Sequence, residues 1–252
     1  MNRIFYGQEV AAKTRIDQLL VARGLCVSRE QAQRAIMAGR VTVGGRMAEK
    51  PGLQVPEDAD VELQGGERYV GRGGFKLEAA LDHFQVSVKG KICLDIGAST
   101  GGFTDCLLQR GAEKVHAIDV GRGQLHWRLR NDSRVVAHEG VNARYLTAED
   151  IGELAQICVA DVSFISLALI LPAAFALLPD AADMIVLIKP QFELSPAKVG
   201  RGGVVRDPDL RMEAVEKIRR VVEAQGKRWL GVIESPLPGR EGNIEFLAHL
   251  RT

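Results

Sequence analysis

The chain has 252 residues, a formal net charge of +1 and 46% hydrophobic residues, which is enough apolar content for one large folded domain and a small one. Its four cysteines are scattered without metal-ligand spacing, so neither disulfides nor a metal site are expected. The richest apolar stretch, 165–178, is interrupted by Pro172 and is too short to span a bilayer, and no signal segment is evident. We therefore expect a soluble, cytoplasmic protein without a membrane role, and no oligomeric state is predicted.

The first region in chain order, 14–63, predicts two short helices followed by small strands. Apolar residues recur at helical spacing from Ile16 until Gly24 ends the first helix. Ser28 is placed to cap a second helix, which ends at Gly39. Short strands are expected at 41–43 and 60–63.

Basic residues are concentrated in this region, although the chain as a whole is nearly neutral. Residues 13–50 contain eight Lys or Arg and three acids, whereas 51–67 contain five acids and no base. Arginines on or beside the two helices offer guanidinium forks to RNA phosphates, or they are ordinary solvated side chains. The six candidates are Arg15, Arg23, Arg29, Arg34, Arg40 and Arg46. Aromatic residues that would stack on bases are absent from 13–50, so little base reading is expected there.

The helix pair followed by Gly-Arg-Val-x-Val at 39–43 resembles the S4 RNA-binding fold. The resemblance implies a small α+β domain that binds RNA. Glycines then cluster between 65 and 74 and mark a flexible junction. We expect an S4-like domain at 1–66 and a second domain at 67–252.

Strand and helix signals alternate along the second domain. Short apolar runs lie at 92–96, 115–119, 135–138, 157–161, 184–189 and 230–234, and 243–250 supplies a final strand. This succession predicts an α/β fold, with a parallel, doubly wound sheet covered by helices on both faces.

The segment 92–104 joins an apolar strand, an acidic residue and a glycine-rich turn in one run. Gly97, Gly101 and Gly102 permit a tight turn before a helix that begins near Phe103. The free N–H groups of a helix start favour an anionic or polar ligand. The spacing differs from the G-x-G-x-x-G of dinucleotide sites, so NAD is disfavoured, and taken alone the loop could be a plain strand-to-helix turn.

Asp-x-Gly-x-x-x-Gly-Gly resembles the first motif of S-adenosylmethionine-dependent methyltransferases, in which the loop wraps around the methionine part. Asp119 ends the next apolar run, where nucleotide-binding α/β units place a ribose-binding carboxylate, although it could be a solvated strand end. Asn142, after the third run, either contacts the adenine or forms a turn. The cofactor set is Asp95, Gly97, Ala98, Ser99, Thr100, Gly101, Gly102, Phe103, Asp119 and Asn142.

Four polar residues stand at strand ends or loop exits where packing does not require them. They are Lys76, Asp161, Lys189 and Glu245. The carboxyl ends of the strands in a doubly wound sheet line the ligand crevice, so Asp161 and Lys189 are expected to face the cofactor. Singly, each has a structural alternative, such as a surface lysine or a helix cap.

The second domain resembles the FtsJ-like ribose methyltransferases, whose catalytic set Lys-Asp-Lys-Glu occurs in the same order at these four positions. Glu241 is a neighbour of Glu245, but only Glu245 fits the Asn-x-Glu pattern. Long motifs extend the resemblance over nearly the whole chain to the TlyA family of haemolysin A-like proteins; they include Arg-Gly-Gly-x-Lys-Leu, Asp-Val-Ser-Phe-Ile-Ser-Leu and Lys-Pro-Gln-Phe-Glu. The resemblance implies methylation of a ribose 2′-hydroxyl in ribosomal RNA, at a cytidine, with ribosomal RNA or subunits as partners.

This reaction needs a positioned base, because a ribose hydroxyl must lose its proton as it attacks the sulfonium methyl group. Lys189 is the candidate base, with Lys76 as a second cation near it, and Asp161 and Glu245 orient the two lysines. Two alternatives stay open. One is a non-catalytic RNA-binding ribosome assembly factor, and the other is a membrane-lytic haemolysin, for which the sequence offers no span or long basic amphipathic helix.

Overall fold

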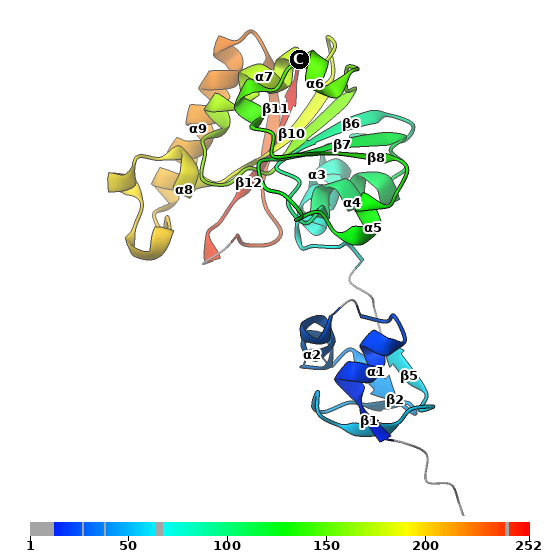
Figure 1. Cartoon of the computed structure of the whole chain (residues 1–252). Helices are drawn as coiled ribbons and strands as arrows, with labels where there is room; N and C mark the ends of the chain where they lie inside the picture. The colour runs from blue at the N-terminus through cyan, green and yellow to red at the C-terminus, as the bar shows by residue number, and fades with distance from the viewer. Residues whose placement is uncertain (1–12, 27, 38, 64–67, 240–241) are drawn as a thin grey trace, which may run out of the picture. The chain divides into compact units, whose positions relative to one another are not determined.

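The computed structural model describes residues 13–26, 28–37, 39–63, 68–239 and 242–252. The chain divides into two compact units between Arg68 and Tyr69 (Figure 1). The predicted boundary between 66 and 67 lies outside the described residues.

The first unit is a small α+β fold. Its elements are β1 (Lys13–Arg15), α1 (Ile16–Ala22), α2 (Arg29–Met37), β2 (Val41–Val43), β3 (Arg46–Met47), β4 (Gln54–Pro56) and β5 (Val61–Leu63). β1 pairs with β4, and β2 lies between β3 and β5, in both cases antiparallel. Both predicted helices and both predicted strands are present. The other three strands, β1, β3 and β4, have two or three residues each and were not predicted.

The helices of the first unit form because their apolar faces share one core. Ile16 and Leu20 of α1 are fully buried and belong to the same cluster as Ala32 and Ile36 of α2. Ser28 Oγ accepts a hydrogen bond from Gln31 N at 3.2 Å, which is the predicted N-terminal cap.

The second unit is a seven-stranded sheet covered by helices (Figure 1). Its strands are β6 (Ile92–Ile96), β7 (Lys114–Asp119), β8 (Val135–Glu139), β9 (Ile157–Ala160), β10 (Asp183–Ile188), β11 (Arg228–Glu234) and β12 (Phe246–Arg251). Its α-helices are α3 (Gly73–His83), α4 (Gly102–Gln109), α5 (Trp127–Arg130), α6 (Ala148–Ile151), α7 (Leu171–Ala176), α8 (Pro190–Glu193) and α9 (Pro208–Ala224).

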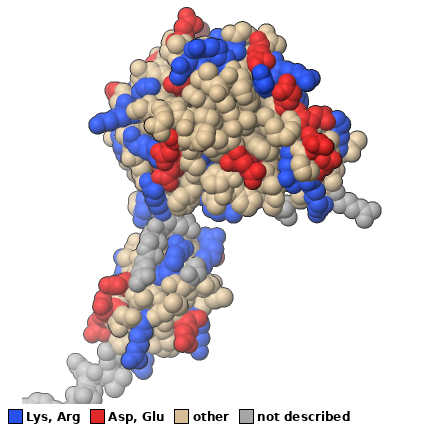
Figure 2. Space-filling model, turned by 180° about the vertical axis from the view of Figure 1, so that it is seen from behind, with Lys and Arg blue, Asp and Glu red and all other residues tan. Residues whose placement is uncertain are grey.

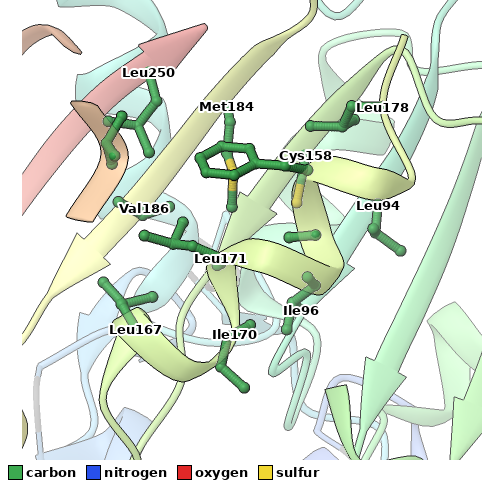
Figure 3. Close-up of a cluster of buried hydrophobic side chains, with 14 of the residues drawn as sticks. Leu94, Ile96, Cys158, Leu167, Ile170, Leu171, Leu178, Met184, Val186 and Leu250 are labelled. Atoms are coloured by element: carbon green, nitrogen blue, oxygen red, sulfur yellow. The ribbon is translucent and has the colours of Figure 1, made fainter. Parts of the chain in front are cut away.

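Alternating side chains of the strands build a separate core on each face of this sheet. In β10, Met184 and Val186 face a cluster that includes residues of α7 and α9, and Figure 3 shows this cluster around Leu171. Ile185 and Leu187 belong to the opposite cluster, with residues of α3, α4 and α5. Strands buried on both faces read as continuous apolar runs, which is why the sequence predicts them well.

The strand order is β11-β12-β10-β9-β6-β7-β8, so the order reverses between β6 and β9. The pairs from β8 to β10 are parallel, as predicted. The prediction of a parallel sheet is wrong for β12, which is antiparallel to both β10 and β11. The described residues between β11 and β12 contain no crossover helix, and a strand that returns without one pairs antiparallel.

The reversed direction of β12 has a consequence for the position of Glu245. Phe246, the first residue of β12, pairs with Ile188, the last residue of β10. Glu245, which precedes β12, and Lys189, which follows β10, therefore lie at the same edge of the sheet.

Gly97, directly after β6, provides a test of how closely the loops after β6 and β9 approach each other. Its φ is +84°, and a Cβ atom there would lie 2.3 Å from the carbonyl oxygen of Asp161. Gly90 is a matched control, because its φ is +68° but nothing lies within 4 Å of an added Cβ atom. We expect Gly97→Ala to lower the free energy of unfolding by clearly more than the ~1–2 kcal/mol that a left-handed conformation costs, and Gly90→Ala by that strain alone. Equal losses in urea unfolding would contradict the close approach.

Candidate active site

A cleft of about 660 Å³ opens at the edge where β6, β7, β9 and β10 end. It lies at the reversal of strand order, where open α/β sheets bind their ligands. Its size falls in the range of about 300–1,000 Å³ that is typical of small-ligand sites. The walls come from the start of α3, the loops after β6 to β10 and the segment before β12.

The glycine-rich loop after β6 forms one wall of the cleft. Six of the predicted cofactor residues line it there: Gly97, Ala98, Ser99, Thr100, Gly102 and Phe103. The N–H groups of Gly97 and Ala98 both donate to Ile118 O of β7, at 2.8 and 3.0 Å. The loop is thereby fixed against the neighbouring strand, and α4 begins at Gly102, which lines the cleft together with Phe103.

Glycines also bring the start of α3 against the start of α4. A Cβ atom on Gly102 would lie 3.1 Å from Gly74 N and 3.3 Å from Gly71 O. This close approach places Lys76, in the first turn of α3, on the cleft wall.

Two predicted cofactor residues, Asp95 and Gly101, lie behind the loop and do not line the cleft. Asp95 is fully buried; its Oδ2 accepts from Thr104 Oγ1 at 2.6 Å, and Oδ1 has no hydrogen-bond partner among the described residues. A Cβ atom on Gly101 would lie 2.2 Å from Leu129 Cδ1. The sequence pattern does not distinguish residues that face the ligand from residues that support the loop.

Asp119 and Asn142 line the cleft from the ends of β7 and β8. Asp119 Oδ2 accepts from Ser99 N, and Oδ1 accepts from Gly121 N, both at 2.7 Å. Asn142 Oδ1 accepts from Arg144 N at 3.1 Å, so it also caps the turn that follows. A turn role and a place on the cleft wall therefore coexist at Asn142.

The four predicted catalytic residues form two ion pairs on this one cleft. Lys76 Nζ donates to Glu245 Oε2 at 2.5 Å, and Lys189 Nζ lies 2.5 Å from Asp161 Oδ1. Lys189 Nζ also donates to Ser163 Oγ at 2.8 Å. Both lysine side chains are nearly buried, with exposed fractions of 10% and 12%. A buried ammonium requires a carboxylate partner, and here each lysine has one.

The place of Glu245 depends on a glycine. A Cβ atom on Gly239 would lie 2.0 Å from Glu245 Oε1, so only a residue without a side chain leaves room for this carboxylate. Glu241, the alternative member of the set, lies outside the described residues.

Four further residues of the motifs quoted above were not predicted as site residues: Ser163, Phe164 and Phe192 line the cleft, whereas Glu193 does not. Ser163 contacts Lys189, as described above. Phe164 is 86% exposed with a φ of +64°, and its ring centroid lies 5.1 Å from that of Phe192. Glu193 is buried four residues after Lys189. The sequence signal that could have found them is the residue type at the other positions of these long motifs. Those positions carry polar or aromatic residues that a simple turn does not need.

The six arginines of the first unit do not form one equivalent set. Asp17 is fully buried and accepts from Arg15 Nε and Nη2 at 2.9 Å and from Arg29 Nη2 at 3.3 Å. These hydrogen bonds, with Arg15 as the main cause, hold the pKa of Asp17 far below its usual value. Arg23 donates to the carbonyl oxygens of Ala59 and Glu57 at 2.7 and 2.5 Å.

Arg34 and Arg46 are exposed, and Arg40 is half-buried. The face of the first unit seen in Figure 2 carries acidic as well as basic side chains. Internal partners thus hold Arg15, Arg23 and Arg29, whereas Arg34 and Arg46 present their side chains to solvent.

Comparison with known proteins identifies the family. The model for FtsJ-like methyltransferases matches residues 69–252, and the model for the S4 domain matches residues 14–61. The chain belongs to the FtsJ-like methyltransferase family. It is therefore an S-adenosylmethionine-dependent methyltransferase that carries an S4 domain.

Similar proteins span nearly the whole chain. It is 49% identical over 245 residues to the 16S/23S rRNA (cytidine-2'-O)-methyltransferase TlyA of Mycobacterium tuberculosis, which covers 96% of this chain and 91% of TlyA. A solved structure from Streptococcus thermophilus, provisionally named a hemolysin, is 45% identical with a TM-score of 0.74 and covers 95% of this chain and 88% of its own. An S-adenosylmethionine-dependent methyltransferase from Mesorhizobium loti shares the fold alone, at 13% identity and a TM-score of 0.51 over 69% of this chain and 96% of its own.

The cleft fits the cofactor of this family. A glycine loop at the start of α4 suits the methionine part, and the carboxylate of Asp119 lies at the end of the next strand, where a ribose is bound in related sites. No described helix of the chain is long and apolar enough to cross a membrane.

The buried Asp95 predicts a specific pH dependence of stability. Burial, opposed by the hydrogen bond from Thr104, raises the pKa of Asp95 from 3.8 to about 7. Between these two values the folded chain holds a proton that the unfolded chain has released, so stability falls as the pH rises through this interval and then levels off. Urea unfolding from pH 4 to 8 should show this decline, and Asp95→Asn should lack that share of it. Identical profiles for the two proteins would contradict the assignment.

Proposed function

We propose that this protein methylates the 2′-hydroxyl of a cytidine ribose in ribosomal RNA. The observation that carries the proposal is the pair of lysine–carboxylate contacts on one cleft beside the glycine loop. The S4 domain and the similarity to TlyA support a ribosomal RNA substrate, in subunits or as free RNA. With such a substrate, we propose that the reaction takes place in the cytoplasm.

The cofactor supplies an electrophilic methyl group on a sulfonium centre. The loop from Gly97 to Phe103 and the start of α4 would hold its methionine part, Asp119 its ribose, and Asn142 would lie against its adenine. Asp161 and Lys189, at the ends of neighbouring strands β9 and β10, border the space for the reacting hydroxyl.

Lys189 in its amine form is the proposed base. Lys189 Nζ would accept the proton of the ribose 2′-hydroxyl as that oxygen attacks the methyl group that the bound cofactor would supply, with the neutral thioether as the leaving group. Asp161 and Ser163 fix the position of Nζ, and Asp161 stabilises the ammonium that forms. Lys76, held by Glu245, adds a second positive charge to the cleft. Holding the oxygen in line contributes about 7–11 kcal/mol in well-oriented systems.

Lys189→Ala tests this assignment. Loss of a positioned base should reduce methyl transfer by about 10²–10⁴-fold, while cofactor binding in calorimetry stays unchanged. The matched control is Lys198→Ala, which removes an exposed lysine that lies 2.5 Å from Glu213. The assay is transfer of tritiated methyl groups to purified ribosomal subunits. Full activity of Lys189→Ala would remove this mechanism.

The same assay separates the alternative functions. An assembly factor that holds the cofactor as a structural element would bind ribosomal RNA and cofactor, yet transfer no label even as the wild-type protein. A membrane-lytic protein would release dye from lipid vesicles in proportion to its dose. We expect label on RNA and no release of dye.

The exposed arginines of the first unit predict how RNA binding depends on salt. Arg34→Glu and Arg46→Glu should weaken binding, and each lost phosphate contact should reduce the slope of log K against log salt by about 0.7–0.9. Arg220→Glu is the control, because Arg220 is 76% exposed on α9 of the second unit. Filter binding at several salt concentrations measures the slopes. Slopes that match the wild type would contradict phosphate contacts at Arg34 and Arg46.

A further inference from the structure

Glu193 is a buried carboxylate of the second unit to which the reaction described above assigns no role. It is the last residue of α8, a single turn that starts directly after Lys189. Its side chain is 2% exposed. Burial of a carboxylate without hydrogen-bond or charge partners costs free energy, so the partners of Glu193 indicate its role.

Both oxygens of the Glu193 side chain bind the loop that follows β9. Its Oε1 accepts from Leu167 N at 2.8 Å, and its Oε2 accepts from the hydroxyl of Ser166. Lys217 of α9 balances the charge, with Nζ 3.2 Å from Oε2 and 2.6 Å from the Glu193 carbonyl oxygen. Lys217 Nζ also donates to Ser166 Oγ at 3.3 Å.

The loop that Glu193 binds is the one that supplies both partners of Lys189. Asp161 and Ser163 precede Ser166 by five and three residues, and Lys189 precedes Glu193 by four. The exits of the parallel strands β9 and β10 are therefore joined at two places: at Lys189 near the strand ends, and at Glu193 further along. If Lys189 alone held the loop after β9, the rest of that loop could move relative to Lys189.

The loop is strained between Ser163, which contacts Lys189, and Ser166, which contacts Glu193. The second contact is therefore needed to hold it. Phe164 has a φ of +64°, which a residue with a bulky side chain rarely adopts. Such conformations persist only where the surrounding contacts enforce them. The Glu193 carboxylate accepts from Ser166 Oγ and Leu167 N, and so provides that enforcement on the far side of Phe164.

We infer that Glu193 is a positioning residue for the methyl transfer, which sets the Asp161 and Ser163 side chains against Lys189 Nζ. The inference rests on the proposed function, because the reaction it supports is the one assigned to Lys189. It predicts a loss in kcat, since the chemistry depends on geometry at Nζ. It predicts little change in cofactor affinity, since Glu193 does not line the cleft.

Three variants test the role of Glu193. Glu193→Ala removes both acceptors and leaves Leu167 N and Lys217 without them, and kcat should fall about hundredfold. Glu193→Gln keeps one carbonyl acceptor for Leu167 N and places an amide donor beside Ser166 Oγ, so it should recover part of that loss. Ser166→Ala removes the hydroxyl that donates to Glu193 and accepts from Ala168 N and Lys217 Nζ, while Lys217 still pairs with the Glu193 carboxylate, so kcat should fall by a smaller factor. Glu213→Gln is the matched control, because it neutralises an exposed glutamate that pairs with Lys198.

Steady-state kinetics on ribosomal subunits and calorimetric titration of the cofactor give the required separation. The expected result is a fall in kcat with a cofactor Kd within twofold of the wild type, and partial recovery in Glu193→Gln. Unchanged kcat in both Glu193→Ala and Ser166→Ala overturns the inference, as does a fall in cofactor affinity that accounts for the whole effect. If Glu193→Ala does not fold, Ser166→Ala and Glu193→Gln decide by the same criteria. An inactive wild-type protein would instead count against the proposed function.

Discussion

The reversal of strand order between β6 and β9 is the constraint on which the active site depends. Parallel strands place their carboxyl ends at one edge, and the reversal sends the loops after β6 and β9 to opposite sides, which leaves a crevice between them. Asp161 and Lys189 reach the crevice because they follow β9 and β10. Glu245 reaches it because β12 runs in the opposite direction and so starts where the others end.

Close backbone approach and paired charge then complete the site. Glycines at 97, 102 and 239 leave room for a carbonyl group, a neighbouring helix start and the Glu245 carboxylate. Each nearly buried lysine has a carboxylate oxygen 2.5 Å from its Nζ, which provides a partner for the positive charge of that lysine. The family's chemistry, methyl transfer from a sulfonium to a weak nucleophile, needs this combination of a fixed base and a fixed donor.

Much of this arrangement was predictable from the sequence because its signals are local. The strands at 92–96 and 157–161 are apolar runs with clear ends, and the glycine loop is a continuous motif. The direction of β12 was not predictable from apolar periodicity, which is the same for either direction. The pairing of Asp17 with Arg15 and Arg29, and the reach of Glu193 to Ser166, depend on contacts between side chains that the fold brings together. No spacing rule reveals such contacts.

The central claim, methyl transfer to a ribose 2′-oxygen, is tested most directly by alkaline hydrolysis of the product RNA. Hydroxide cleaves RNA through the free 2′-hydroxyl, so a methylated ribose blocks cleavage at its own 3′ side. After incubation of ribosomal RNA with the protein and S-adenosylmethionine, the hydrolysis ladder should lack a band at a cytidine, and the Lys189→Ala variant should restore it. A complete ladder from RNA that carries the labelled methyl group would place the label on a base and contradict the account.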